Sequence, residues 1–267
     1  MRKQKKLGLS LRGGAGRASG YIGVFKALRD ADIQVDYLIG SSMGSILGSL
    51  YAANFTISDM IEFSQLFQLK KMISFESIVD LSLFGDRKFQ EEAKDVFRNM
   101  HLEDLKIPMY IQSTNLKTRK CEVFNKGPIF KLLSTSCAFP FYMPPVEYNG
   151  QYYIDGDITA GYGADYLRKQ GADVVMGLSA GKGTSDVNHS SLISRFLDPI
   201  LIAAENYKNV DLQAHPIDIH IDNLGLDAAT FCYDRIPQLI DNAYEVTMTN
   251  MPEIKDKLEI KNQLFYS

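Results

Sequence analysis

The sequence predicts an α/β protein with a mostly parallel central sheet flanked by helices. Three observations support this prediction. The chain opens in the order strand, loop, helix, strand and helix, which is typical of a parallel sheet covered by helices. Its 267 residues, 45% of them apolar and 23% charged, suffice for one large core. Residues 37–58 carry no charge, which favours a strand and a helix that are both buried.

The first part of the chain supplies that opening order. Residues 6–11 predict a short strand, and residues 13–16 form a glycine-rich loop. Residues 20–30 place apolar side chains at helical spacing, so we expect the first helix there. Residues 35–39 predict a second strand, and residues 43–53 a second helix.

The middle of the chain is less regular. Residues 58–83 are loosely helical, and residues 87–99 form a charged amphipathic pattern that predicts another helix. Residues 109–113 and 122–124 predict strands paired through a polar turn at 117–120. Apolar side chains between Phe63 and Phe84 predict core, with a lipid-facing cap as the alternative.

The last part of the chain returns to strands and helices. Pro128 opens a predicted helix to about Cys137, and the prolines at 140, 144 and 145 predict an irregular segment after it. The remaining expectations are strands at 152–154, 174–178 and 217–221, a helix between the last two strands, and a closing helix at 236–250.

Composition excludes several classes of protein. Lys and Arg number 29 against 32 Asp and Glu, a net charge of −3, so we expect no nucleic-acid partner. Cys121, Cys137 and Cys232 are an odd number of widely spaced thiols, which excludes a full disulfide framework. With no apolar stretch after the basic start, we expect no secretory signal and a cytoplasmic protein. The start itself, residues 1–6, is either a solvated tail or a weak site for anionic lipid.

A membrane span must also be considered for residues 37–58, because Gly40, Gly44 and Gly48 have the small-xxx-small spacing of transmembrane dimers. The same stretch contains several serines together with Asn54 and Thr56, too many polar groups for lipid. A strand that leads into a buried helix explains the missing charges better.

Residues Gly40 to Gly44 form a GxSxG motif between a predicted strand and a predicted helix. A serine on such a sharp turn stands exposed above the sheet edge, and the glycines relieve crowding there. The helix N-terminus favours developing negative charge nearby. Ser42 is therefore a candidate nucleophile, and a tight turn packed with small residues is the alternative interpretation.

A nucleophilic serine needs a base. An α/β-hydrolase would supply a late histidine, yet no histidine of this chain has a supporting motif. The elbow also follows only two strands, earlier than is usual in that fold. The four histidines are His101, His189, His215 and His220.

The glycine-rich loop, residues 13–16, lies between the first strand and the first helix. Small residues there allow backbone N–H groups to converge on an oxyanion near the elbow. A dinucleotide site would need a glycine at Ser19 and an acidic residue at the end of the second strand. Residues 177–182 are one residue short of a P-loop. Asp155-Gly156, taken alone, indicates only a turn.

Together these motifs resemble the patatin-like phospholipase family in order and surroundings. The segment from Leu9 to Val24 looks like its oxyanion loop and first helix, and Gly40 to Gly44 like its elbow. Ile107 to Phe124 is similar to its mid-chain strand pair. Thr135 to Gly156 looks like the approach to its catalytic Asp-Gly. The resemblance covers residues 7–250, as a single domain between a basic tail, 1–6, and an extension, 251–267.

The resemblance implies a three-layer fold and a Ser–Asp dyad that hydrolyses lipid acyl esters through an acyl-serine intermediate. Carried over by motif, Ser42 is the nucleophile and Asp155 its base. No metal or cofactor is implied, the substrate is a phospholipid or another acyl ester, and a peripheral membrane surface is expected. The other implied positions are the oxyanion loop (Gly13, Gly14, Ala15, Gly16), its brace Arg17, the elbow glycines Gly40 and Gly44, and Gly156 with Asp157.

Three positions depart from the family pattern. Ala15 and Ala18 replace glycines, and an alanine is strained wherever φ is positive. Asp157 adds a second carboxylate that would raise the pKa of Asp155. Two alternatives therefore stay open beside a lipid acyl hydrolase. One is a soluble thioesterase or acyltransferase, and the other is a catalytically weak or inactive lipid-binding protein of the same fold.

Overall fold

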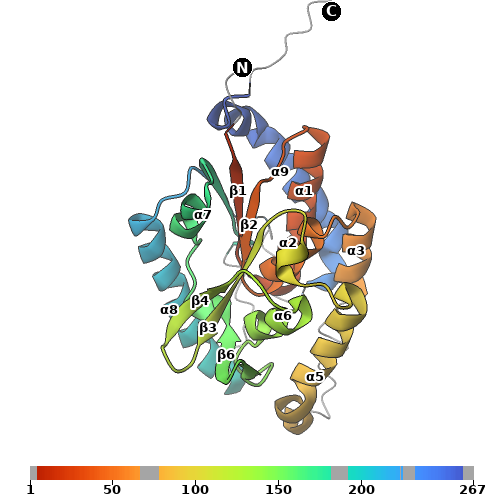
Figure 1. Cartoon of the computed structure of the whole chain (residues 1–267), viewed down its shortest axis with the longest axis vertical. Helices are drawn as coiled ribbons and strands as arrows, with labels where there is room; N and C mark the ends of the chain where they lie inside the picture. Colours follow the sequence, from red (N-terminus) through yellow and green to blue (C-terminus); the bar gives the residue numbers. More distant parts are fainter. Residues whose placement is uncertain (1–4, 67–77, 182–191, 223, 225–231, 261–267) are drawn as a thin grey trace, which may run out of the picture.

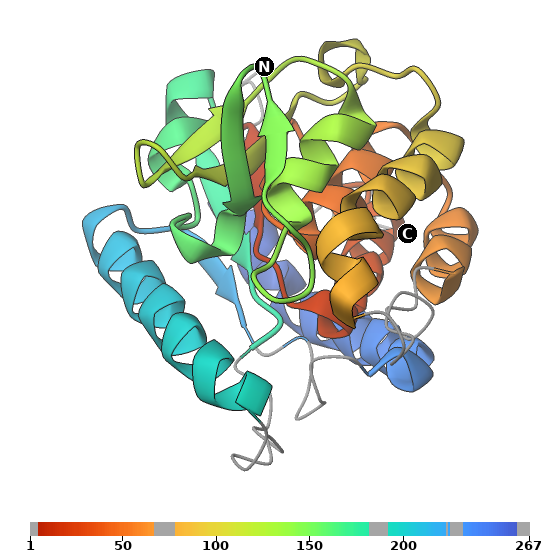
Figure 2. The same cartoon turned by 90° about the horizontal axis from the view of Figure 1, so that it is seen from below.

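The computed structural model describes residues 5–66, 78–181, 192–222, 224 and 232–260. A mixed eight-stranded sheet runs through the molecule, with helices on both faces (Figures 1 and 2), so the expected α/β architecture is confirmed. The strands are β1 (Leu7–Leu11), β2 (Tyr37–Gly40), β3 (Met109–Asn115), β4 (Lys120–Phe124), β5 (Val146–Tyr148), β6 (Gln151–Asp155), β7 (Val174–Leu178) and β8 (Ile219–Ile221). The helices are α1 (Tyr21–Asp30), α2 (Met43–Ala52), α3 (Ile57–Leu66), α5 (Ile78–Phe97), α6 (Ile129–Cys137), α7 (Ala164–Gln170), α8 (Leu192–Ala214) and α9 (Ile236–Lys257), with short 3₁₀ turns that include η1 (Ala15–Gly20) and η4 (Gly156–Ile158).

The strand order is β5-β6-β3-β2-β1-β7-β8, and β4 also pairs with β3. The β1, β2, β3, β7 and β8 pairings are parallel, whereas β3 pairs antiparallel with β4 and β6. Every residue of β1 and β7 is buried, as expected for parallel strands that are covered on both faces. The predicted pairing of residues 109–113 with 122–124 is confirmed, because Ser113 lies opposite Glu122.

Two apolar cores lie on opposite faces of this sheet. The larger one joins β1 to α1, α2, α6 and α9, and Phe25 and Phe97 are among its fully buried members. The smaller one packs α7 against Ile39 and Val175. In Figure 2, α7 and α8 accordingly lie on the side of the sheet away from α1, α2 and α9.

Several expected boundaries differ from the structure. The apolar residues 78–83 belong to α5, so the helix expected at 87–99 starts at Ile78 and ends at Phe97. The change from apolar to charged residues near Phe84 therefore lies within the single helix α5 and does not mark the end of a helix. The closing helix continues past Asn250 to Lys257 despite Pro252, because Met251 and Ile254 are buried in the core.

Two elements were not expected, namely β5 and α7. The segment between α6 and β5 is irregular, as the prolines predicted. In the apolar stretch, Phe63 is buried, and the side chains between Leu66 and Phe84 lie outside the described residues. Of the basic start, Lys5 pairs with Glu259 at 3.0 Å and Lys6 donates to the Tyr37 hydroxyl at 3.2 Å.

The uncharged stretch of residues 37–58 divides between β2, α2 and the start of α3, with α2 only 10 residues long. Among the described residues, no helix is long and apolar enough to span a bilayer. The glycines of the small-xxx-small pattern serve close contacts inside the protein instead. A Cβ on Gly48 would lie 2.8 Å from Leu11 in the neighbouring strand.

Candidate active site

Ser42 occupies the sharp turn between β2 and α2, at the carboxyl end of the parallel strands. Its φ of 49° and ψ of −132° are sparsely populated for a residue with a side chain, so the backbone is strained here. The glycines on either side permit the turn. A Cβ on Gly40 would lie 2.8 Å from the Gly44 backbone, and one on Gly44 would lie 2.2 Å from the Leu11 carbonyl oxygen.

Asp155 is the last residue of β6 and lies opposite Ser113 of β3. Its side chain is fully buried. One carboxyl oxygen, Oδ1, accepts a hydrogen bond from the Asp157 backbone N–H at 2.9 Å. The other, Oδ2, is buried and has no hydrogen-bond partner among the described residues.

Ser42 lies near this carboxyl group, since hydrogen bonding from its side chain is one of the influences that lower the pKa of Asp155. The net shift is upward. Burial raises the pKa of Asp155 most, the Asp157 carboxylate raises it further, and together they bring it to about 8. Asp155 is thus a carboxyl group poised to exchange a proton near neutral pH, next to a serine hydroxyl.

The glycine-rich loop crosses directly over the elbow. A Cβ on Gly13 would lie 2.7 Å from Cβ of Ser42, so only a glycine backbone fits this close to the serine. Gly14 has a φ of 155°, and Ala15 adopts a φ of 48° where η1 begins. Ala15, where the family pattern has a glycine, therefore adopts a left-handed backbone conformation, which costs about 1 kcal/mol for an alanine. Ala18 is fully buried within η1.

Arg17 lies at the end of the loop and is 8% exposed. Its Nη1 atom donates to the Gly181 carbonyl oxygen at 2.7 Å, which ties the loop to the segment that follows β7. Burial lowers the pKa of Arg17. The contact is made to protein backbone, in keeping with the bracing role that the resemblance implied.

Sequence reasoning missed two residues at this site. Arg12 is buried behind the loop and lies 3.2 Å from Asp157 through its Nη2 atom. Ser136 of α6 accepts a hydrogen bond from the Ser42 backbone N–H. The sequence did indicate a role for Arg12, because it is a charged residue directly after the buried strand β1. It gave no such indication for Ser136.

The histidines lie elsewhere. His220 bonds to the Tyr162 hydroxyl at 2.8 Å, and His215 bonds to Asp211 at 3.0 Å. His101 lies 3.6 Å from Glu103, and His189 falls outside the described residues. The charged groups that shift the pKa of Asp155 are instead Asp157, which raises it, and Arg12, which lowers it. In the described part of the chain, no cluster of three metal-binding side chains occurs.

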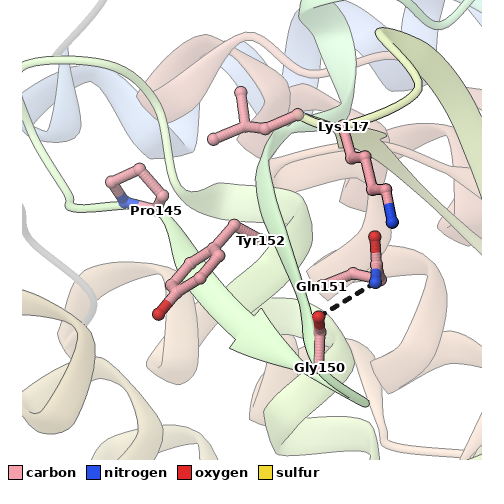
Figure 3. Close-up of a pocket in the computed structure, with 6 residues that line it drawn as sticks. Lys117, Pro145, Gly150, Gln151 and Tyr152 are labelled. Atoms are coloured by element: carbon pink, nitrogen blue, oxygen red, sulfur yellow. Dashed lines mark hydrogen bonds between the residues drawn. The ribbon is translucent and has the colours of Figure 1, made fainter.

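A shallow surface pocket of about 600 Å³ lies farther along β3 and β6 (Figure 3). Leu116 and Tyr152, which are joined by a backbone hydrogen bond of 2.9 Å, form part of its lining. Leu116 directly follows β3, three residues after Ser113, and Tyr152 lies in β6, three residues before Asp155, the residue opposite Ser113. The pocket is therefore separate from the turn that carries Ser42.

Fold and site together define an α/β protein with a strained serine elbow, a glycine-rich loop above it and a buried carboxyl group beside it. The patatin-like phospholipase family model matches residues 9–168, more than half of the chain. The chain belongs to this family, whose lipid hydrolases are serine esterases.

Curated relatives match over a limited part of their length. A neuropathy target esterase of Drosophila melanogaster is 28% identical over 182 residues, which cover 66% of this chain and 13% of that protein. A patatin-like phospholipase domain-containing protein of Caenorhabditis elegans is 30% identical over 184 residues, covering 66% and 14%. The matched region thus spans about one seventh of these relatives.

Solved structures share the fold at low sequence identity. VipD from Legionella pneumophila superimposes with a TM-score of 0.53 at 14% identity, over 94% of this chain and 67% of that one. Human GIVD cytosolic phospholipase A2, in complex with methyl gamma-linolenyl fluorophosphonate, gives 0.54 at 12% identity, over 96% and 58%.

Proposed function

We propose that this chain is a lipid acyl hydrolase that cleaves carboxylic esters of phospholipids or lysophospholipids with a Ser42–Asp155 dyad. One observation carries the proposal. A strained elbow serine lies near a fully buried carboxyl group whose Oδ2 atom has no hydrogen-bond partner among the described residues. Family membership and the relatives described as a lysophospholipase and esterases support the substrate class.

In the proposed reaction, the Ser42 oxygen attacks the acyl carbonyl carbon while its proton passes to the Asp155 carboxylate. Backbone N–H groups of the loop 13–16 stabilise the oxyanion. The tetrahedral intermediate expels the alcohol, which takes the proton from Asp155, and an acyl-serine remains. Water then attacks this ester and gives a proton to Asp155. The second tetrahedral intermediate releases the fatty acid, and the Ser42 oxygen takes the proton back from Asp155, which restores the free serine and the carboxylate.

The carboxyl group needs its special environment for this role. An ordinary aspartate is too weak a base for a serine hydroxyl, and a pKa of about 8 brings Asp155 closer to the working pH. The same shift leaves much of Asp155 protonated at neutral pH, so we expect the proposed enzyme to be most active at alkaline pH. Because its substrates are lipids, we also propose that it acts at a membrane surface.

A fluorophosphonate probe tests the proposal, because it reacts with activated serines. We expect the wild type to be labelled, Ser42→Ala to give no labelling, and Asp155→Asn to be labelled slowly. Ser58→Ala, at an exposed serine of α3, is the matched control and should label like the wild type. A folded wild type that is not labelled but binds vesicles would favour the lipid-binding alternative.

Substrate class is tested on the same proteins. Hydrolysis of phospholipid vesicles at a rate well above that of a soluble thioester or a monomeric ester supports the lipid assignment. The reverse order would favour the thioesterase or acyltransferase alternative. A Ser42→Ala protein that keeps full esterase activity would contradict the dyad itself.

A further inference from the structure

Three segments of the site meet at one oxygen atom, Oδ1 of Asp157. It accepts hydrogen bonds from the Gly13 backbone N–H at 3.3 Å and from the Ser41 hydroxyl at 2.5 Å. It also lies 3.2 Å from Nη2 of Arg12. Gly13 belongs to the glycine-rich loop, Ser41 to the elbow, and Asp157 to the turn that follows Asp155. One carboxylate therefore touches all the parts that the proposed reaction brings together.

Arg12 is fixed on both sides of this contact. Its side chain is 8% exposed, and its Nη1 atom donates to the carbonyl oxygens of Ala160 and Gly161. The backbone carbonyl of Arg12 accepts a hydrogen bond from the buried Tyr21 hydroxyl at 2.8 Å. A buried guanidinium is costly unless it is paired, so Arg12 and Asp157 depend on each other for their position.

We propose that Arg12 and Asp157 form a clasp that positions the loop 13–16 against Ser42, so that the N–H group of Ala15, not that of Gly13, faces the oxyanion. This inference rests on the proposed function. Arg12 and Asp157 act through the loop and through Asp155, so both are positioning residues.

The backbone favours Ala15 over Gly13 as the donor. The N–H of Gly13 already points at Asp157, and a Cβ on Gly13 would lie 1.8 Å from Oδ2 of that residue. The Gly14 carbonyl accepts from the Arg17 N–H at 3.2 Å inside η1. Because a trans peptide directs its N–H opposite to its C=O, the Ala15 N–H points out of the start of this turn.

The clasp also carries two charges beside Asp155. Asp157 raises the pKa of Asp155 and Arg12 lowers it. Cys137 lies close to both carboxyl groups, and the buried Tyr21 lies close to Asp157; burial keeps both of these side chains neutral by raising their pKa values. Removing the charge of Asp157 or of Arg12 should therefore move the pH dependence of the reaction in opposite directions.

The experiment measures kcat and KM for a soluble ester, and the fluorophosphonate labelling rate, between pH 5 and 10. Asp157→Asn keeps an oxygen that accepts from Gly13 and Ser41 but loses the charge that pairs with Arg12. The rise of the rate with pH should therefore move to lower pH, with a smaller loss of maximal rate than in Asp157→Ala. Arg12→Met should move the rise of the rate with pH to higher pH. Asp157→Ala removes the acceptor and should lower kcat by about 10²-fold with little change in KM, since the oxyanion forms only in the transition state.

Arg168 and Asp218 provide a matched control pair. Their side chains lie 2.7 Å apart, Arg168 also donates to a backbone carbonyl, and Asp218 also accepts from a backbone N–H. This is the same combination of contacts away from Ser42. Arg168→Met and Asp218→Asn should leave the pH profile unchanged.

Hydrogen exchange gives a readout that does not depend on turnover. Exchange of the peptide that covers residues 12–16 should be faster in Asp157→Ala than in the wild type, because Gly13 loses its acceptor. A wild type that does not react with the probe would remove the proposed function, and the exchange result would still decide whether the clasp holds the loop. Unchanged exchange in Asp157→Ala, or a rise of the rate with pH that moves in the same direction in Asp157→Asn and Arg12→Met, would overturn the clasp.

Discussion

The backbone N–H of Ser42 donates a hydrogen bond to the hydroxyl oxygen of Ser136, 3.0 Å away. Ser136, which is fully buried in α6, donates in turn to the Gln112 carbonyl of β3 at 2.7 Å. A side chain from a helix more than 90 residues away thus joins the strained elbow to the sheet. Strain of the kind seen at Ser42 persists only where the surroundings hold it in place.

Ser136→Ala tests this link. The substitution removes the hydroxyl that accepts from the Ser42 N–H and donates to the Gln112 carbonyl, so we expect a loss of about 1–3 kcal/mol in the free energy of unfolding. We also expect slower fluorophosphonate labelling, because the elbow can relax. Ser134→Ala on the same helix is the control: Ser134 is equally buried, but its hydroxyl only bonds back to the Phe130 carbonyl at 2.9 Å. Equal effects of the two substitutions would show that the link to Ser42 is not special.

The pH dependence of catalysis follows from Asp155. With its pKa raised to about 8 by burial and by Asp157, the proposed base is deprotonated only at alkaline pH. Ester hydrolysis should therefore rise with pH through that region. Asp155→Asn should lower kcat by about 10²–10⁴-fold, and its rate should no longer rise with pH through this region. A pH profile that is flat between 6 and 9 would argue against Asp155 as the base.

The same group makes a prediction about stability. The folded protein holds the Asp155 proton up to about pH 8, whereas in the unfolded chain the pKa of Asp155 is that of an ordinary aspartate, 3.8. Between these values the native state binds more protons, so the contribution of Asp155 to stability falls as the pH rises. Asp155→Asn, which cannot ionise, should therefore melt higher than the wild type at pH 8, and the difference should shrink toward pH 4. Thermal melting at both pH values checks this.

Close backbone approach at the elbow makes a further prediction. A Cβ on Gly44 would lie 2.2 Å from the Leu11 carbonyl oxygen, a sheet atom that cannot move aside. Gly44→Ala should destabilise the protein by about 3 kcal/mol. At Gly150, a Cβ would meet nothing within 4 Å, and its φ of 72° costs alanine only about 1 kcal/mol. Urea unfolding of both variants measures the difference; similar losses would contradict the steric explanation.

Local sequence patterns located most of this architecture. The uncharged and apolar runs of β1, β2 and β7 identified buried parallel strands, and the glycines around Ser42 identified the turn. Short elements were harder. Strand β5 has three residues and α7 has seven, too few to show a period, and both depend on packing against the sheet. The start of α5 was misplaced because its composition changes within one helix.

The sequence by itself determined the family and the fold class. It also indicated the elbow, the loop and Asp155 as candidate site positions, because each of these motifs consists of residues adjacent in the chain. Tertiary structure alone decided the contacts among segments far apart in the chain. It placed Ser136 under the Ser42 amide, Arg12 against Asp157, and the Asp155 carboxyl in a fully buried position. Hydrogen bonds, ion pairs and desolvation depend on distances in space, and these arise only when the strands assemble into one sheet.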